Sequence, residues 1–177
     1  MLKNNKKLHL DGAGNTYIQH PTSPGDEVKF VVGSDTLLVL TEAGNSGNLV
    51  DMGTSGAGFT QFEPTYNAAD TYVYFNRFGN KAFLTFGAGN IADLNLSFPD
   101  ASCNCTLVLK QDGTGGRTVA ADGWLTTDQA GSNASTVKWA GGSPPTLSTG
   151  GNAIDIISFY WDNDNHTAYG VASLNFS

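Results

Sequence analysis

The stretch Asp93-Leu94-Asn95-Leu96-Ser97-Phe98 alternates strictly between polar and apolar residues. Because successive side chains of a β-strand point to opposite faces of a sheet, this alternation predicts a strand with one wet and one buried face. Residues 153–161 (AIDIISFYW) form the most apolar run of the chain and predict a central strand. These two stretches indicate a protein built from β-strands.

The same kind of pattern extends in both directions along the chain. Short apolar or alternating runs are separated by turns rich in glycine, asparagine and aspartate, which suit the backbone conformations of turns. The runs that predict further strands are residues 7–11, 16–19, 28–32, 36–40, 72–75, 82–86, 106–110, 117–119, 137–139 and 169–176. Many short strands at regular spacing are typical of a β-sandwich or jelly roll. We therefore expect an all-β protein with an antiparallel β-sandwich of jelly-roll type.

Composition supports this fold class and suggests two parts. The chain of 177 residues contains 22 glycines and only three glutamates, which excludes an all-α or coiled-coil protein. Hydrophobic residues make up 40% of the chain, which excludes wholesale disorder. Residues 43–58 form the most linker-like stretch. We expect a short strand-rich N-terminal segment, residues 1–55, followed by the sandwich domain, residues 56–177.

Charge and hydropathy exclude several classes of partner. A formal net charge of −7 gives the chain no overall attraction for a phosphate backbone, so we expect no binding to nucleic acid. No stretch approaches the roughly 18 apolar residues of a membrane span, so we expect no membrane insertion. The basic start of the sequence is not followed by an apolar segment, which predicts synthesis in the cytoplasm without a signal peptide.

Residues with catalytic or cofactor chemistry are scarce. The sequence contains no Gly-x-Ser-x-Gly elbow, no phosphate-binding Walker loop, no His-Glu-x-x-His motif and no dinucleotide fingerprint followed by a helix. None of the three histidines, His9, His20 and His166, has a neighbour that suggests a catalytic role. We expect a protein that is not an enzyme and needs no cofactor.

The two cysteines, Cys103 and Cys105, are separated by one residue. In a strand, positions i and i+2 lie about 7 Å apart on one face, which is longer than the usual Cα separation of a disulfide. A bridge between them would need a bent backbone. The spacing favours two reduced thiols and leaves open an interchain or strained disulfide and a metal site.

Two loops carry dense polar groups. Residues 162–166 (Asp-Asn-Asp-Asn-His) favour a solvated hairpin turn between strong strands. Alternate Asp and Asn oxygens also ligate calcium in EF-hand loops, which leaves Asp162 and Asp164 as a weaker metal-site interpretation. Residues 112–116 (Asp-Gly-Thr-Gly-Gly) resemble a phosphate cradle, but no helix is predicted after them, so a turn is favoured.

Five aromatic residues have two interpretations, of which packing in the core is favoured over a surface that binds sugars. Tyr160, Trp161, Tyr169, Trp124 and Trp139 can stack on sugar rings, although about half of such residues in alternating strands face the core. The candidate glycan-binding or receptor-binding residues are Trp161, Asp162, Asn163, Asp164, Asn165 and Tyr169.

Several segments resemble proteins of bacteriophage particles. Residues 8–18 (LHLDGAGNTYI) and 30–38 (FVVGSDTLL) resemble segments of tail fibre proteins of marine bacteriophages. Residues 107–119 (LVLKQDGTGGRTV), 137–142, 145–147, 153–160 and 169–176 resemble the C-terminal domain of phage tail fibres and related virion proteins. Together these segments cover roughly two thirds of the chain and carry no catalytic motif.

The resemblance implies a homotrimeric virion protein, with the C-terminal domain near the distal tip and the N-terminal segment attached to other virion proteins or forming a shaft. It implies a short fibre or spike that binds a host-surface glycan or receptor. Only about 50 residues precede the linker, whereas such fibres are usually long, so a head fibre or capsid decoration protein remains an alternative. Two further alternatives are a monomeric carbohydrate-binding module with an aromatic platform and a glycan depolymerase.

Overall fold

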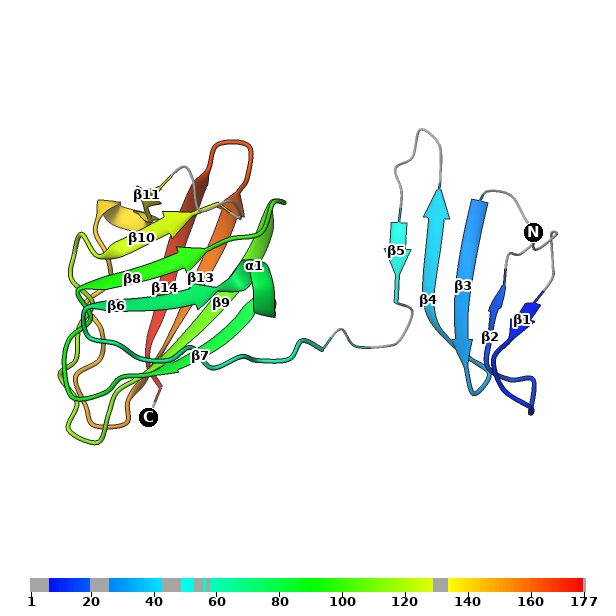
Figure 1. Ribbon diagram of the computed structural model, residues 1–177, viewed down its shortest axis with the longest axis horizontal. Helices are drawn as coiled ribbons and strands as arrows, with labels where there is room; N and C mark the ends of the chain where they lie inside the picture. The colour runs from blue at the N-terminus through cyan, green and yellow to red at the C-terminus, as the bar shows by residue number, and fades with distance from the viewer. Residues whose placement is uncertain are drawn as a thin grey trace. The chain divides into compact units, whose positions relative to one another are not determined.

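The computed structural model describes residues 7–19, 26–42, 49–52, 56, 58–128 and 134–176. The chain divides into two compact units, Met1–Gly58 and Phe59–Ser177. The sequence prediction set the boundary after residue 55. Both units are built from β-strands (Figure 1), which confirms the all-β class. No helix in the described ranges is long and apolar enough to cross a membrane.

The first unit is a single five-stranded sheet in which every strand pairs with its neighbour in sequence. The strands are β1 (Lys7–His9), β2 (Tyr17–Gln19), β3 (Asp26–Val32), β4 (Asp35–Glu42) and β5 (Leu49–Asp51). All four pairings are antiparallel, in the order β1-β2-β3-β4-β5. Gly33 and Ser34, both with positive φ, form the two-residue turn between β3 and β4 that such hairpins favour.

One face of this sheet carries seven apolar residues in two adjacent register rows. Residues that lie opposite one another in antiparallel strands share a face. The registers align Leu8, Ile18, Phe30 and Leu38 in one row and Val28, Leu40 and Val50 in another. None of these seven side chains is buried. We refer to these seven residues as the apolar face.

The opposite face of the sheet is mostly polar. One register row of this face carries Lys7, Gln19, Lys29, Val39 and Asp51. The Lys7 ammonium lies 3.7 Å from the centre of the Tyr17 ring, and Lys29 pairs with Glu27 at 3.3 Å. Val31, on this face, is the only buried residue among those described in the first unit. The described residues of the first unit therefore form no hydrophobic core of their own.

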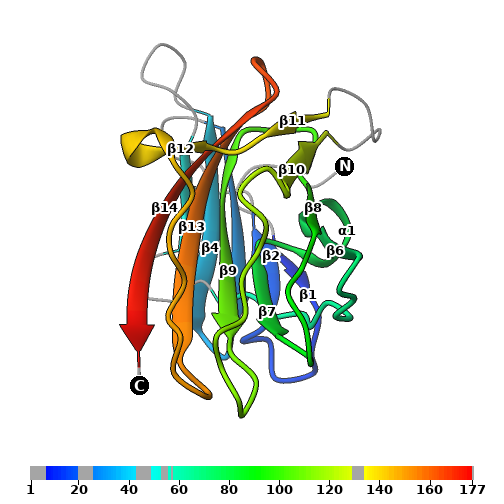
Figure 2. The same cartoon turned by 90° about the vertical axis from the view of Figure 1, so that its left-hand side faces the viewer.

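The second unit contains two sheets. The four-stranded sheet has the order β11-β10-β8-β6. Its strands are β6 (Asp70–Tyr74), β8 (Asp93–Ser97), β10 (Trp124–Thr127) and β11 (Ser135–Thr136). The five-stranded sheet has the order β12-β14-β13-β9-β7, and Figure 2 shows β14, β13, β9 and β7 side by side. Its strands are β7 (Lys81–Thr85), β9 (Cys103–Lys110), β12 (Lys138–Trp139), β13 (Ile154–Asp162) and β14 (Thr167–Phe176).

The strand pairing of these sheets is mixed, so the predicted antiparallel arrangement is wrong for part of the unit. Strands β6, β8 and β10 pair in parallel, as do β7 with β9 and β12 with β14. Antiparallel pairing joins β13 to both β9 and β14, and β10 to β11. The chain alternates between the two sheets from β6 to β10. Each return to a sheet therefore runs in the same direction as the previous visit, which produces parallel neighbours.

The buried sides of both sheets contribute to one core. The inward positions of β13 include Ile157, Phe159 and Trp161, and those of β8 are Leu94 and Leu96. The ring of Phe98 stacks on Trp161 at a centroid distance of 4.7 Å. Burial of each large apolar side chain contributes about 1.5–3 kcal/mol. The core accounts for the position of β13 in the middle of its sheet, as the apolar run predicted.

The predicted strand at residues 117–119 does not form. Only Val119 makes an isolated bridge, to Ile91, and the next strand is β10 at Trp124–Thr127. The short helix α1 (Phe75–Phe78) follows β6 directly and connects it to β7. This connection brings the edge strands of the two sheets together at one side of the unit.

Candidate functional site

The predicted site at residues 162–166 is a hairpin turn between β13 and β14, as one of the two interpretations of its sequence expected. We call these residues the acidic loop. The Asp162 carboxylate accepts hydrogen bonds from the backbone N–H of Asn165 at 3.2 Å and from its side-chain amide at 2.9 Å. These bonds to Asn165 hold the pKa of Asp162 below its usual range. Asp162 therefore stabilises the turn.

Other polar groups of the acidic loop bind the neighbouring chain. The backbone N–H of Asn163 donates to the hydroxyl of Ser102 at 3.0 Å, and the Asn163 amide reaches Asp100 at 3.5 Å. His166 lies 3.9 Å from the carboxylate of Asp128. Within the described part of the chain, no three potential metal-ligating side chains gather in one place. The solvent-facing groups of the loop are Asp164 and Asn165.

The two aromatic residues of the predicted site separate in the structure. Trp161 is fully buried, and its indole N–H donates to the Pro99 carbonyl at 3.0 Å, so it cannot stack on a ligand. Position 161 faces inward because the inward positions of β13 are the odd-numbered ones. Tyr169 is 44% exposed and lies beside Tyr160, with ring centroids 6.5 Å apart. These two tyrosines form an exposed aromatic pair outside the core.

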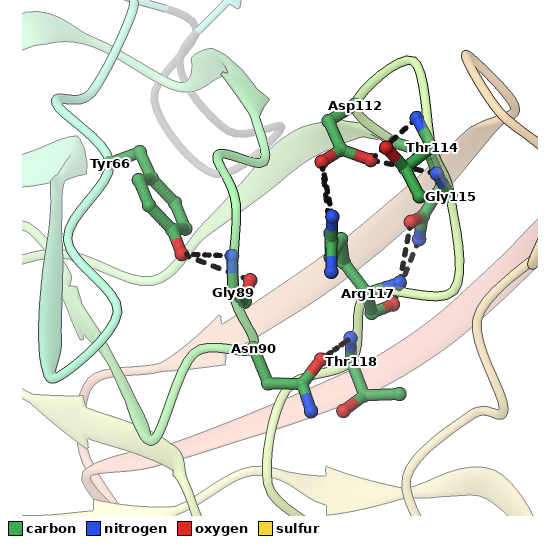
Figure 3. A network of polar contacts seen from close by, with 9 residues as sticks. Tyr66, Gly89, Asn90, Asp112, Thr114, Gly115, Arg117 and Thr118 are labelled. Atoms are coloured by element: carbon green, nitrogen blue, oxygen red, sulfur yellow. Dashed lines mark hydrogen bonds and ion pairs between the residues drawn. The ribbon is translucent and has the colours of Figure 1, made fainter.

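In the glycine-rich turn at residues 112–116, the side chain of Asp112 binds the backbone N–H groups that a phosphate would otherwise contact. The Asp112 carboxylate accepts hydrogen bonds from the backbone N–H groups of Thr114 at 3.1 Å and Gly115 at 2.7 Å, and from the guanidinium of Arg117 at 2.7 Å (Figure 3). Gly115 has a φ of 78°, and a Cβ there would clash with the carbonyl oxygen of Thr149. The turn is thus a structural element whose amide groups already have an anionic partner.

The cysteines lie on one face of β9, with their sulfur atoms 3.7 Å apart, and both are free thiols. Burial, with a further contribution from Cys103, raises the pKa of the Cys105 thiol far above its usual value. A thiol of this kind is held in its neutral form and is a poor nucleophile or metal ligand. Of the histidines, His9 packs against Tyr17 and His20 lies outside the described residues.

A pocket that the sequence did not predict lies where β6 and α1 meet the segment that precedes them. Its volume is about 690 Å³, within the ~300–1,000 Å³ usual for small-molecule sites. Four aromatic side chains line it, namely Phe62, Tyr72, Tyr74 and Phe78. Tyr72 is 46% exposed and Phe78 is 57% exposed, so their rings are accessible. We call this site the aromatic pocket.

Backbone pairing fixes the walls of the aromatic pocket. Tyr72 and Tyr74 alternate with the buried Val73 on β6, so both point away from the core, and their rings stack at 5.8 Å with an interplanar angle of 10°. The segment opposite is held to β7, because the N–H of Phe62 donates to the Lys81 carbonyl at 3.0 Å and Phe62 accepts from Phe83 at 2.9 Å.

The polar lining of the aromatic pocket is acidic. It includes the carboxylates of Glu63 and Asp70 and the amide of Asn67, all exposed. Within the described part of the chain, neither carboxylate has an ion-pair partner. The guanidinium of Arg77 lies 4.8 Å over the ring of Tyr74 and is not part of the lining. The pocket therefore combines apolar ring surfaces with hydrogen-bond acceptors and negative charge.

One signal for this pocket was present in the sequence. The spacing of Tyr72 and Tyr74 in a predicted strand places both rings on one face. The segment of residues 62–67 showed no strand pattern, and its approach to β6 depends on tertiary pairing with β7.

Comparison with known proteins gives no information on function, so the proposals below rest on the sequence, the fold and the sites described above. No protein-family model, no curated protein sequence and no solved structure matches this chain.

Proposed function

We propose that this chain is a structural protein of a bacteriophage virion, a short trimeric fibre or spike that contributes to attachment to a host-surface glycan. In this proposal the second unit is the tip domain, a β-sandwich with polar loops, and the first unit holds the chains together or attaches them to other virion proteins. The protein is made in the host cytoplasm and functions in the particle.

The observation that carries the proposal is the uncovered apolar face of the first unit. A strand spacing of ~4.8 Å and a rise of ~3.4 Å per residue give the five strands an area of roughly 400 Å². Patches of about 300–600 Å² on a monomer are often interaction sites. Because none of the seven residues of the apolar face is charged, an identical apolar face from a second and a third chain would match it.

Exposed apolar residues of the second unit also support assembly. Val171, Leu174 and Phe176 of β14 are all exposed. A stable interface buries about 800 Å² from each partner, which is more than the apolar face supplies. Apolar surface from both units would therefore contribute to the trimer.

A capsid decoration protein is the second candidate, and the same face favours it. A flat apolar sheet can dock on a shell of other proteins instead of on copies of itself. In that case the free protein would be monomeric and would become stable on the capsid. A stand-alone carbohydrate-binding module, with the aromatic pocket as its binding surface, would also be monomeric.

The mass of the protein in solution, measured by light scattering, tests the proposal. We expect three times the chain mass, unchanged by a chelator, and binding of the trimer to host cells. A monomer would refute the trimeric fibre and leave the decoration protein or the isolated binding module. A trimer that dissociates when metal is removed would instead support a metal at Asp162 or Asp164.

A further inference from the structure

We propose that the aromatic pocket binds an amino sugar, a pyranose ring that carries a protonated amine. This inference rests on the proposed function in one respect, because it names the chemistry of the glycan that a virion appendage would contact. The acidic loop is a poorer candidate, because Trp161 is buried and Asp162 is bonded within its own turn.

The aromatic walls of the pocket suit the apolar face of a sugar ring. One face of a pyranose presents C–H groups, which are weakly positive, and the faces of aromatic rings are weakly negative. Tyr72 on β6 and Phe78 on α1 expose their rings in the pocket. The stacked partner Tyr74 fixes Tyr72, so little side-chain freedom is lost when a ligand binds.

The carboxylates of the pocket decide which sugar binds best. Glu63 and Asp70 can accept hydrogen bonds from hydroxyl groups of any sugar. Their negative charge attracts an ammonium group and repels a carboxylate. Since no lysine or arginine is part of the lining, the lining itself offers an acidic sugar no cation to pair with. The order of affinity is therefore amino sugar, then neutral sugar, then acidic sugar.

Binding of three monosaccharides by the full-length protein tests this inference. The probes are the methyl glycosides of glucosamine, glucose and glucuronic acid, titrated by NMR at low ionic strength. We expect the glucosaminide to bind about 5- to 10-fold more tightly than the glucoside, and the glucuronide not to bind. Added salt should reduce the preference for the amine, because salt screens exposed charges.

Four variants and one control separate the roles of the pocket residues. Tyr72→Ala and Phe78→Ala should each weaken binding of the glucosaminide and the glucoside at least 10-fold. Glu63→Gln and Asp70→Asn should remove most of the preference for the amine while binding of the glucoside remains. Tyr160→Ala, which removes an exposed ring of the other aromatic pair, should change nothing. A melting temperature close to that of the wild type verifies that each variant is folded.

Specific outcomes would overturn the inference. They are absence of saturable binding to all three probes, wild-type affinity in the folded Tyr72→Ala and Phe78→Ala variants, or equal affinity for the glucuronide. A trimer that adsorbs to host cells but binds none of the probes would refute the pocket and leave the proposed function intact. A monomer that binds the glucosaminide would refute the trimeric fibre and support the aromatic pocket as a binding site.

Discussion

At the scale of single residues, Asp155 is the clearest case of a polar side chain that stabilises the core from within. It occupies an inward position of β13 and is 1% exposed. Its carboxylate accepts hydrogen bonds from the N–H of Ser148 at 2.8 Å, the hydroxyl of Ser148 at 2.5 Å and the N–H of Asn175 at 3.0 Å. The β13–β14 register shifts at this position, so one carboxylate satisfies the backbone of the irregular pairing.

We therefore expect Asp155→Ala to lower the free energy of unfolding by about 3 kcal/mol, because a buried donor without a partner costs ~1–3 kcal/mol. Chemical denaturation measures this change. The matched control is Ser158→Ala, an exposed position on the same strand, which should change stability by less than about 0.5 kcal/mol. Equal effects of the two substitutions would refute the role of Asp155.

Asp112 predicts a pH dependence with a definite sign. Its hydrogen bonds to the Arg117 guanidinium and to the backbone of Gly115 hold the pKa of the carboxyl below its usual range. A lowered pKa in the folded protein contributes stability that is complete above the ordinary pKa. That stability is lost as the pH falls through the lower, folded-state value. The difference in melting temperature between wild type and Asp112→Asn should thus be largest near neutral pH and disappear in acid.

Thermal unfolding from about pH 7 to about pH 2.5 measures this dependence. Asp122→Asn, in an exposed turn before β10, serves as the control for loss of a negative charge. If the Asp112→Asn difference grows as the pH falls, the contribution assigned to the carboxylate has the wrong sign.

At the scale of elements, the sheet of the first unit predicts opposite results for adjacent residues. Leu40 belongs to the apolar face and Thr41 to the polar face of the same strand. Leu40→Glu should weaken assembly at least about 100-fold, because a carboxylate would be buried in an apolar interface. Thr41→Glu should leave assembly intact. Sedimentation across a range of protein concentrations compares the assembly of the two variants. If neither substitution changes assembly, no partner covers the apolar face.

Strand positions were predictable from the sequence where a side-chain alternation was strong. The runs at residues 93–98, 153–161 and 169–176 correspond to β8, β13 and β14, because each strand has one face in the core. The pairing of the strands was not predictable. Alternation shows which face is buried but not which sheet a strand joins, and here successive strands join different sheets.

Whether a predicted site residue is accessible to a ligand likewise depends on the face of the sheet to which its side chain points. Trp161 and Tyr169 are both aromatic residues of apolar runs, yet one is buried and the other exposed. The aromatic pocket was not predictable from the sequence, because it forms between β6 and residues 62–67, which are brought together only by the tertiary structure.

At the scale of the whole molecule, the two units differ in how they are stabilised. The second unit has its own core, whereas the first has one buried residue among those described. A fragment of residues 59–177 should unfold cooperatively, at a temperature independent of its concentration. A fragment of residues 1–58 should be unfolded when dilute and become ordered as its concentration rises. Circular dichroism at several concentrations distinguishes them, and a dilute, folded 1–58 fragment would contradict the need for a partner.

The order of strands in the five-stranded sheet has a consequence for the newly made chain. Strand β14 comes after all the others in the sequence, yet it lies inside the sheet, between β12 and β13. Until residues 167–176 have left the ribosome, β12 has no neighbour in its sheet and one edge of β13 stays open. The first unit, with only neighbouring pairings, can form its hairpins during synthesis. The second unit has to wait for its last strand, and its open edge during that interval is a surface for chaperones or for mispairing with other chains.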